Sequence, residues 1–239
     1  MAQLAVINPD SLHGWPPKSP AETVCHMALS KVETHLYTSL NDFLSQKDFE
    51  MRPDLKQFRR ETPTGFQNII LSFSPYQAET YLEVNIGTRL NMVEEIVQQF
   101  LDNMPEFWRQ ANTVVVSVGK INDAKYFRYR IADDEDLHVC TEQVIEFMDQ
   151  RGFMFLEYAS HLKNLDVMFN AKPHQSVKYL YNQLHRCFKG VVIARLSHNP
   201  HFLTLIEQYH DKLLKLGASP TNMAEYDRLV NYLLHFSAN

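Results

Sequence analysis

Apolar residues recur along the chain with two different spacings, one typical of helices and one typical of strands. Helical spacing begins after Ser19, which is followed by Pro20 and Glu22 in the pattern of an N-cap, a first-turn proline and a capping-box acid. The sequence therefore predicts a helix from Ser19 to about residue 44, preceded by a proline-containing arm over 1–18. Its apolar positions are Cys25, Leu29, Val32, Leu36, Leu40 and Phe43.

Two segments with alternating apolar and polar residues follow, FQNIILSFS and TYLEVNIG. Alternation is the pattern of a strand with one buried face. Because the link between them, PYQAE, is short, we expect the two strands to pair as an antiparallel hairpin. KQFRRET, which precedes them, is a candidate edge strand. The inward residues of the hairpin should be Ile69, Leu71, Phe73, Leu82, Val84 and Ile86.

The same order of elements then occurs a second time. Asn91 is the expected cap of a helix that has Glu94 in its first turn and an apolar stripe at Leu90, Val93, Ile96, Val97 and Phe100. NTVVVSVG and KYFRYRI, joined by INDA, predict a second hairpin. Its inward residues should be Val114, Val116, Val118, Phe127, Tyr129 and Ile131. A helix over about 135–150 follows, and Gly152 should end it.

The rest of the chain is predicted to be helical. RGFMFLEY is compatible with a short strand or with the start of a helix. A helix should run from Pro173 to about Leu196, with an apolar stripe at Val177, Leu180, Tyr181, Leu184, Phe188, Val191 and Val192. Asn199 and Pro200 should begin the next helix, which Gly217 ends, and Ser219-Pro220 should begin the last one. Their short connections predict antiparallel neighbours.

These elements together predict an α+β fold. An antiparallel sheet with the order ββα-ββα should carry its helices on one face, and a helical C-terminal part should pack against it. The expected organisation is an N-terminal arm over 1–18, a sheet domain over 19–151 and the helical part over 152–239. A chain of 239 residues can bury such a core without the help of disulfides or metals.

Composition narrows the classes of function. Three cysteines without a CxxC motif indicate reduced thiols and a cytoplasmic protein. The first residues do not form a secretory pattern, and no apolar run reaches the roughly 20 residues of a membrane span. A net charge of −5 argues against nucleic acid as the partner. Phosphate-binding loops and hydrolase motifs are absent from the sequence, so no cofactor is expected.

The stretch RLSHNPHFLTLIEQYHD is the first candidate for chemistry, because it holds three histidines and two acids. His201 and His210 are out of phase on a helix and do not share a face. His198 and His201 could meet, but no HExxH or similar spacing supplies further metal ligands. We interpret the stretch as the start of a helix. Cys140 and Cys187, each two positions after a histidine, are expected to pack as small apolar residues.

The second face of the sheet is a stronger candidate, because alternation fixes its residues. They are Asn68, Ile70, Ser72, Tyr81, Glu83, Asn85, Thr113, Val115, Ser117, Tyr126, Arg128 and Arg130. Tyrosine and arginine are the residue types that dominate binding hot spots. We therefore predict a binding site at Tyr81, Glu83, Tyr126, Arg128 and Arg130, with no catalytic residue and no metal ligand. The alternative is a face that is solvated or covered by the C-terminal helices.

We interpret the chain as a non-enzymatic cytoplasmic protein that acts through a protein partner or a second copy of itself, of a regulatory or immunity-like kind found in bacteria. A first alternative is a small-molecule-binding protein or enzyme, in which Arg128 or Arg130 holds an anionic group, Glu83 is a base and Tyr81 or Tyr126 is a donor. A second alternative is a single-stranded nucleic-acid platform, since KINDAKYFRYR interleaves basic and aromatic side chains.

Overall fold

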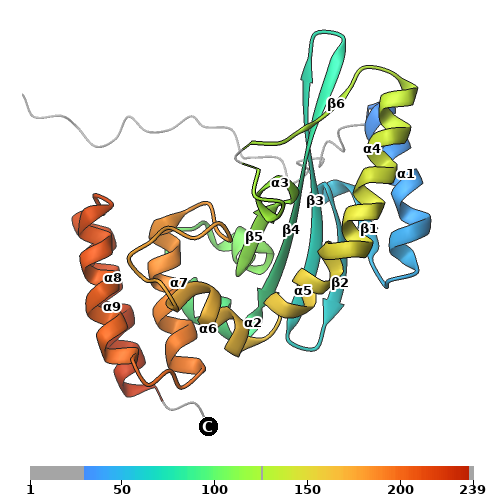
Figure 1. Ribbon diagram of the computed structural model, residues 1–239. Coiled ribbons are helices and arrows are strands. Elements are labelled where there is room, and N and C mark those ends of the chain that lie inside the picture. Colours follow the sequence, from blue (N-terminus) through green and yellow to red (C-terminus); the bar gives the residue numbers. More distant parts are fainter. Residues whose placement is uncertain (1–29, 125, 237–239) are drawn as a thin grey trace, which may run out of the picture.

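A computed structural model describes residues 30–236 apart from residue 125. It has the predicted α+β fold, with one antiparallel sheet in the order β1-β2-β3-β4-β5 and with β6 also beside β4 (Figure 1). The strands are β1 (Glu50–Arg52), β2 (Gln57–Thr62), β3 (Gly65–Tyr76), β4 (Glu79–Leu90), β5 (Val114–Ser117) and β6 (Tyr129–Ile131). The predicted strand at KQFRRET is β2, and it is not an edge strand because β1 pairs with it.

Helices cover one face of the sheet and also form a separate layer beside it (Figure 1). They are α1 (Lys31–Ser45), α2 (Asn91–Val97), α3 (Val118–Ile121), α4 (Asp134–Phe147), α5 (Phe153–Ala159), α6 (Leu162–Asn170), α7 (Gln183–Leu196), α8 (Phe202–Lys215) and α9 (Pro220–His235). A π-helical turn, Met148–Gly152, joins α4 to α5, and 3-10 turns occupy Pro53–Leu55 and Pro105–Gln110. The segment RGFMFLEY is therefore helical.

The predicted first hairpin is confirmed. β3 and β4 pair along their whole length, and the register places Ile69 opposite Ile86 and Leu71 opposite Val84. All four of these side chains are buried under α1 and α4, as alternation requires.

The predicted second hairpin is wrong. β5 and β6 do not pair with each other, because each pairs with β4, β5 against Asn85–Thr88 and β6 against Thr80–Leu82. Together they behave as one edge strand that is interrupted by an excursion over 118–128, which contains α3. Val118 is buried as predicted but begins α3, and Phe127 remains 41% exposed.

Several helices begin at other residues than the sequence predicts. Ser30 is extended and forms a capping box with Glu33, so α1 begins at Lys31, and residues 19–29 of the predicted helix lie outside the described residues. Asn91 is the first residue of α2, not its cap. Asn199 accepts a hydrogen bond from the His201 N–H, but α8 begins only at Phe202.

Two further helical predictions are wrong. Gly152 does not end a helix, since its backbone is helical and the chain continues through the π-helical turn into α5. The segment from Pro173 to Tyr181 is not helical, because α7 begins after Asn182, whose side chain accepts from the N–H groups of the first turn. The ends at Gly217 and Ser219 are confirmed by a left-handed glycine and a capping box.

Apolar side chains form two cores. One lies between the sheet and the helices α1 and α4. The other gathers α2 with α6, α7, α8 and α9. β5 contributes to both, with Val116 in the first core and Val114 in the second. The division into domains at residue 152 stays a prediction, although α2 packs in the second core.

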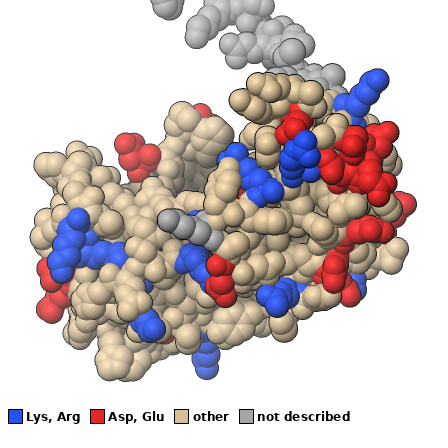
Figure 2. Space-filling view, turned by 45° about the horizontal axis from the view of Figure 1, so that its top comes forward, with Lys and Arg blue, Asp and Glu red and all other residues tan. Residues whose placement is uncertain are grey.

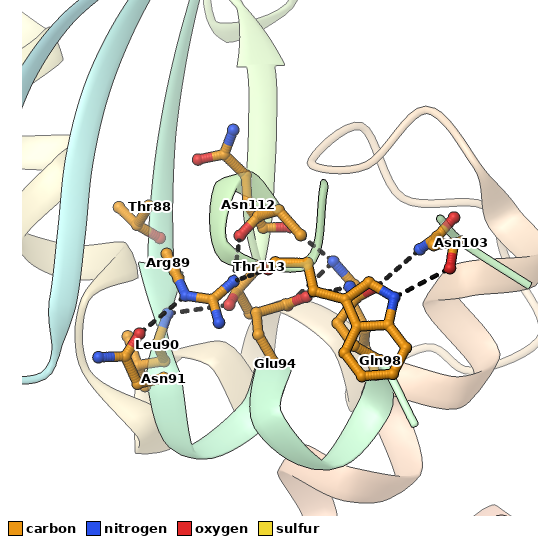
Figure 3. A network of polar contacts seen from close by, with 12 residues as sticks. Thr88, Arg89, Leu90, Asn91, Glu94, Gln98, Asn103, Asn112 and Thr113 are labelled. Carbon is orange, nitrogen blue, oxygen red and sulfur yellow. Dashed lines mark hydrogen bonds and ion pairs between the residues drawn. The ribbon is translucent and has the colours of Figure 1, made fainter. Parts of the chain in front are cut away.

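A buried ion pair links α2 to α7 within the second core, in the polar network around Glu94 that Figure 3 shows. Lys189 Nζ of α7 lies 3.0 Å from Glu94 Oε1 of α2, and their side chains are 4% and 0% exposed. Gln98 donates to the second oxygen of Glu94 at 2.8 Å, and Lys189 also donates to the Asn112 carbonyl at 2.5 Å. Arg89, near the end of β4, donates to the carbonyls of the segment before β5. The network therefore fixes α2, α7 and that segment against the sheet.

Replacing Lys189 by methionine should destabilise the fold by about 3–5 kcal/mol, because Glu94 would remain buried without its counter-charge. Urea unfolding followed by circular dichroism measures this. The double variant Glu94→Leu/Lys189→Met should recover much of the loss, since both charges are then removed. Arg228→Met, which breaks the exposed pair with Glu225, is the matched control and should cost less than about 1 kcal/mol. Equal losses for Lys189→Met and Arg228→Met would contradict this account.

Candidate functional site

The five predicted site residues lie along β4 and the β6 segment and form two neighbouring clusters. In the first, Arg128 Nε lies 3.6 Å from Glu83 Oε2, and the guanidinium carbon lies 5.2 Å from the centre of the Tyr126 ring. Tyr126 is 74% exposed. The structure thus brings Glu83, Tyr126 and Arg128 together.

The second cluster is built around Glu79, which is not among the predicted site residues. The Tyr81 hydroxyl donates to Glu79 Oε2 at 3.1 Å, and Arg130 hydrogen-bonds to the other oxygen of this carboxylate. The hydrogen bond from Arg130 lowers the pKa of Glu79. Arg130 also lies 3.8 Å from Asp136 at the start of α4. Tyr81 and Arg130 are direct cross-strand partners.

Tyr181 completes the first cluster and was missed by sequence reasoning. Its hydroxyl lies 2.7 Å from Asn85 Oδ1 and 3.2 Å from Glu83 Oε1. Lys120 Nζ lies 4.0 Å from the centre of its ring. The helical spacing of the apolar residues predicts Tyr181 in the stripe of a helix. Recognising Asn182 as the N-cap of α7 would have placed Tyr181 in the preceding loop.

Two buried cations hold the loop that carries Tyr181. Arg186 is fully buried and donates to the carbonyls of Phe169, Lys172, Pro173 and Gln175. Lys212 Nζ donates to the carbonyls of His174 and Gln175 at 3.1 and 2.9 Å. Burial and the neighbouring Arg186 lower the pKa of Lys212. Because both buried cations donate to main-chain carbonyls of this loop, the chain after α6 must wrap around them before it reaches the sheet.

The second face of the sheet is covered at one end and exposed at the other. At the β5 end, Asn68 donates to Gln57 at 2.6 Å and both side chains are buried. A side chain at Gly87 would collide there with the amide oxygens of Asn68 and Asn112. Near β6, Ser72 and Arg130 are exposed and Tyr81 is half-buried. The exposed half of the face is therefore the half that carries the predicted site.

The buried cysteines are not candidates for nucleophiles. Burial raises the pKa of the thiols of Cys140 and Cys187 to about 12, so both are protonated at neutral pH. They pack in the two cores, as predicted.

The three histidines of the C-terminal stretch do not gather. His198 and His201 are exposed, whereas the His210 ring packs 6.4 Å from the Tyr226 ring. Within residues 30–124 and 126–236, no group of three His, Cys, Asp or Glu side chains is arranged to hold a metal ion.

Comparisons of the chain with protein-family models, curated proteins and solved structures find no match. Across the described residues, no helix combines the length and the apolar character needed to cross a bilayer.

Alkaline pH should unfold the protein through its buried thiols. Because the folded-state pKa of each thiol is raised, its contribution to stability is complete below the ordinary value near 9 and is lost as the pH rises toward 12. The loss is about 1.4 kcal/mol per pH unit for each thiol. Urea unfolding between neutral pH and about pH 11 should therefore show a shallower decline for the variant Cys140→Ala/Cys187→Ala than for the native chain. The buried Tyr209 and Tyr226, whose pKa values are also raised, leave a residual decline in both. An unchanged decline in the double variant would refute the assignment.

Proposed function

We propose that the chain is a non-enzymatic interaction protein and that a protein partner binds the exposed half of the second sheet face, over Tyr126, Arg128 and Tyr181. The observation that supports this most is the exposure of large aromatic side chains on that half. Tyr126, Tyr76 and Tyr181 are 74%, 62% and 50% exposed. Two arginines of the same half are held by ion pairs, Arg128 with Glu83 and Arg130 with Glu79. Exposed tyrosines next to ordered arginines are typical of binding hot spots.

Charge pairing favours a protein over a nucleic acid at this surface. Arg128 is paired with Glu83, and Arg130 with Glu79 and Asp136, so these two arginines offer little unpaired positive charge to phosphates. Acidic side chains gather on the right of the molecule in Figure 2, on the side of α1 and α4. The first turn of α4 carries three acids, Asp134, Glu135 and Asp136. Because Asp136 lies 3.8 Å from Arg130, a partner that covers the exposed half of the second face should place basic residues opposite the start of α4.

Side chains, rather than the main chain, should make the contacts. β2 pairs with β3 only as far as Ile70, so no strand of the described residues lies beside the outer edge of 72–76. The Leu71 N–H donates to the Lys56 carbonyl, away from β4. Because backbone groups alternate between the two edges of a strand, the nitrogens of Phe73 and Pro75 face the same outer edge. Proline has no N–H to donate there, and it is a common protection of strand edges against the addition of a further strand.

Photo-cross-linking in cells of the source organism tests this proposal. A photoreactive phenylalanine analogue at position 126 should cross-link one protein specifically, whereas the same analogue at position 158 should not. Tyr158 is the matched control, because it is a half-exposed tyrosine on α5 that belongs to neither cluster of the predicted site. A band that corresponds to two copies of this chain would assign the partner as a second copy.

Affinity for the cross-linked partner should then fall at least about tenfold in Tyr126→Ala and stay unchanged in Tyr158→Ala. Neither variant should unfold, because both side chains are exposed and truncation leaves no cavity. If Tyr126→Ala and Arg128→Ala/Arg130→Ala both bind the partner as tightly as the native chain, the proposed surface is wrong.

A further inference from the structure

Two breaks in regular structure face each other on the α4 side of the sheet. The strand formed by β5 and β6 is interrupted by the excursion over 118–128, and the helix formed by α4 and α5 is interrupted by the π-helical turn Met148–Gly152. Arg151 Nη1 of the turn donates to Asn122 Oδ1 of the excursion at 2.9 Å. π-helical turns are rare in proteins and occur frequently at functional sites.

A cavity of about 530 Å³ lies between these two breaks. Its apolar surface comes from Phe127, Tyr129 and Phe147, and its polar surface from Asn122, Gln143, Glu146, Gln150 and Arg151. Phe127 stands edge-on to Tyr129 at 4.8 Å, and it remains 41% exposed. Gly119 also lines the cavity, and Phe127 can pack against it only because glycine has no side chain, since a Cβ atom there would lie 2.5 Å from Phe127 Cβ. The volume is within the range of small-molecule sites.

From this geometry we propose that the cavity binds a neutral, planar heteroaromatic molecule of the nucleoside class. Aromatic side chains offer stacking surfaces for a base. The amides of Gln143 and Gln150 offer both donors and acceptors, which is what the hydrogen-bonding edge of a base requires. One N–H of Gln150 already donates to Glu146 at 2.8 Å, which leaves its second N–H and its oxygen for a ligand. Glu146 and Arg151 balance each other in charge, and Arg151 is engaged by Asn122, so the lining favours a nucleoside over a phosphorylated nucleotide.

The cavity is distinct from the proposed partner surface, although one segment serves both. Tyr129 is buried and, with Phe127, lines the cavity, whereas the neighbouring Arg128 and Arg130 point to the second sheet face, where they pair with acids of β4. The inference therefore does not rest on the proposed function, and it can fail while the partner surface stands.

Titration of the ¹⁵N-labelled full chain with adenosine, guanosine, cytidine and uridine, followed by NMR, tests the proposal. At least one nucleoside should cause saturable shifts of the side-chain amides of Gln143 and Gln150 and of backbone amides in the π-helical turn, with a Kd between about 10 μM and 1 mM. The corresponding monophosphate should bind several-fold more weakly, because Glu146 repels it, and Glu146→Gln should reduce that difference.

Variants separate this site from adventitious binding. Phe127→Ala should weaken the binding about tenfold through the loss of stacking, and Gln143→Ala several-fold through the loss of a hydrogen bond. Phe107→Ala, which removes an exposed phenylalanine elsewhere on the molecule, should have no effect. The proposal is overturned if no nucleoside gives saturable shifts, if the shifts lie away from the cavity, or if Phe127→Ala binds as tightly as Phe107→Ala.

Discussion

The pairing of one long strand determines the rest of this structure. β4 has 12 residues, and β3 occupies one of its edges along the whole length. The other edge must also find partners, since buried backbone groups without hydrogen bonds are costly. β5 and β6 share it, and the chain between them therefore leaves the sheet after Ser117 and returns at Tyr129. That excursion places Lys120 and Tyr126 beside the second sheet face, and Asn122 and Phe127 at the cavity beside α4.

Buried polar groups, and not apolar contacts alone, determine how the helical layer meets the sheet. The pair Glu94–Lys189 allows one arrangement of α2 against α7, because any shift would leave a charge buried and unpaired. Arg186 acts similarly on the loop after α6, whose carbonyls surround its guanidinium. The position of Tyr181 on the sheet face thus follows from a cation buried at a distance from it. We infer that these groups contribute more to the uniqueness of the fold than to its stability.

The sequence predicts best those elements whose signals are local. Alternation identifies β3 and β4, and Ser219 with Pro220 identifies the start of α9. The broken strand could not be predicted, because Val114 and Val116 alternate in the same way whether β5 pairs with β6 or with β4. Glycine is a common residue at helix ends, but the backbone of Gly152 is helical, and a Cβ atom on it would lie 2.5 Å from Met148 Sδ.

The candidate site was predictable only in part, because the sequence signals that identify its residues are local and some of its residues come from distant segments. Alternation predicts four of its residues, Tyr81, Glu83, Arg128 and Arg130. Three others reach the site from a hairpin end, an excursion and a distant loop, namely Glu79, Lys120 and Tyr181.

The pairing of both β5 and β6 with β4 is central to this structure, and nuclear Overhauser contacts between backbone protons test it most directly. We expect contacts between Tyr81 and Arg130 and between Ile86 and Val116. Contacts between residues 114–117 and 129–131 would instead show a hairpin and contradict the account.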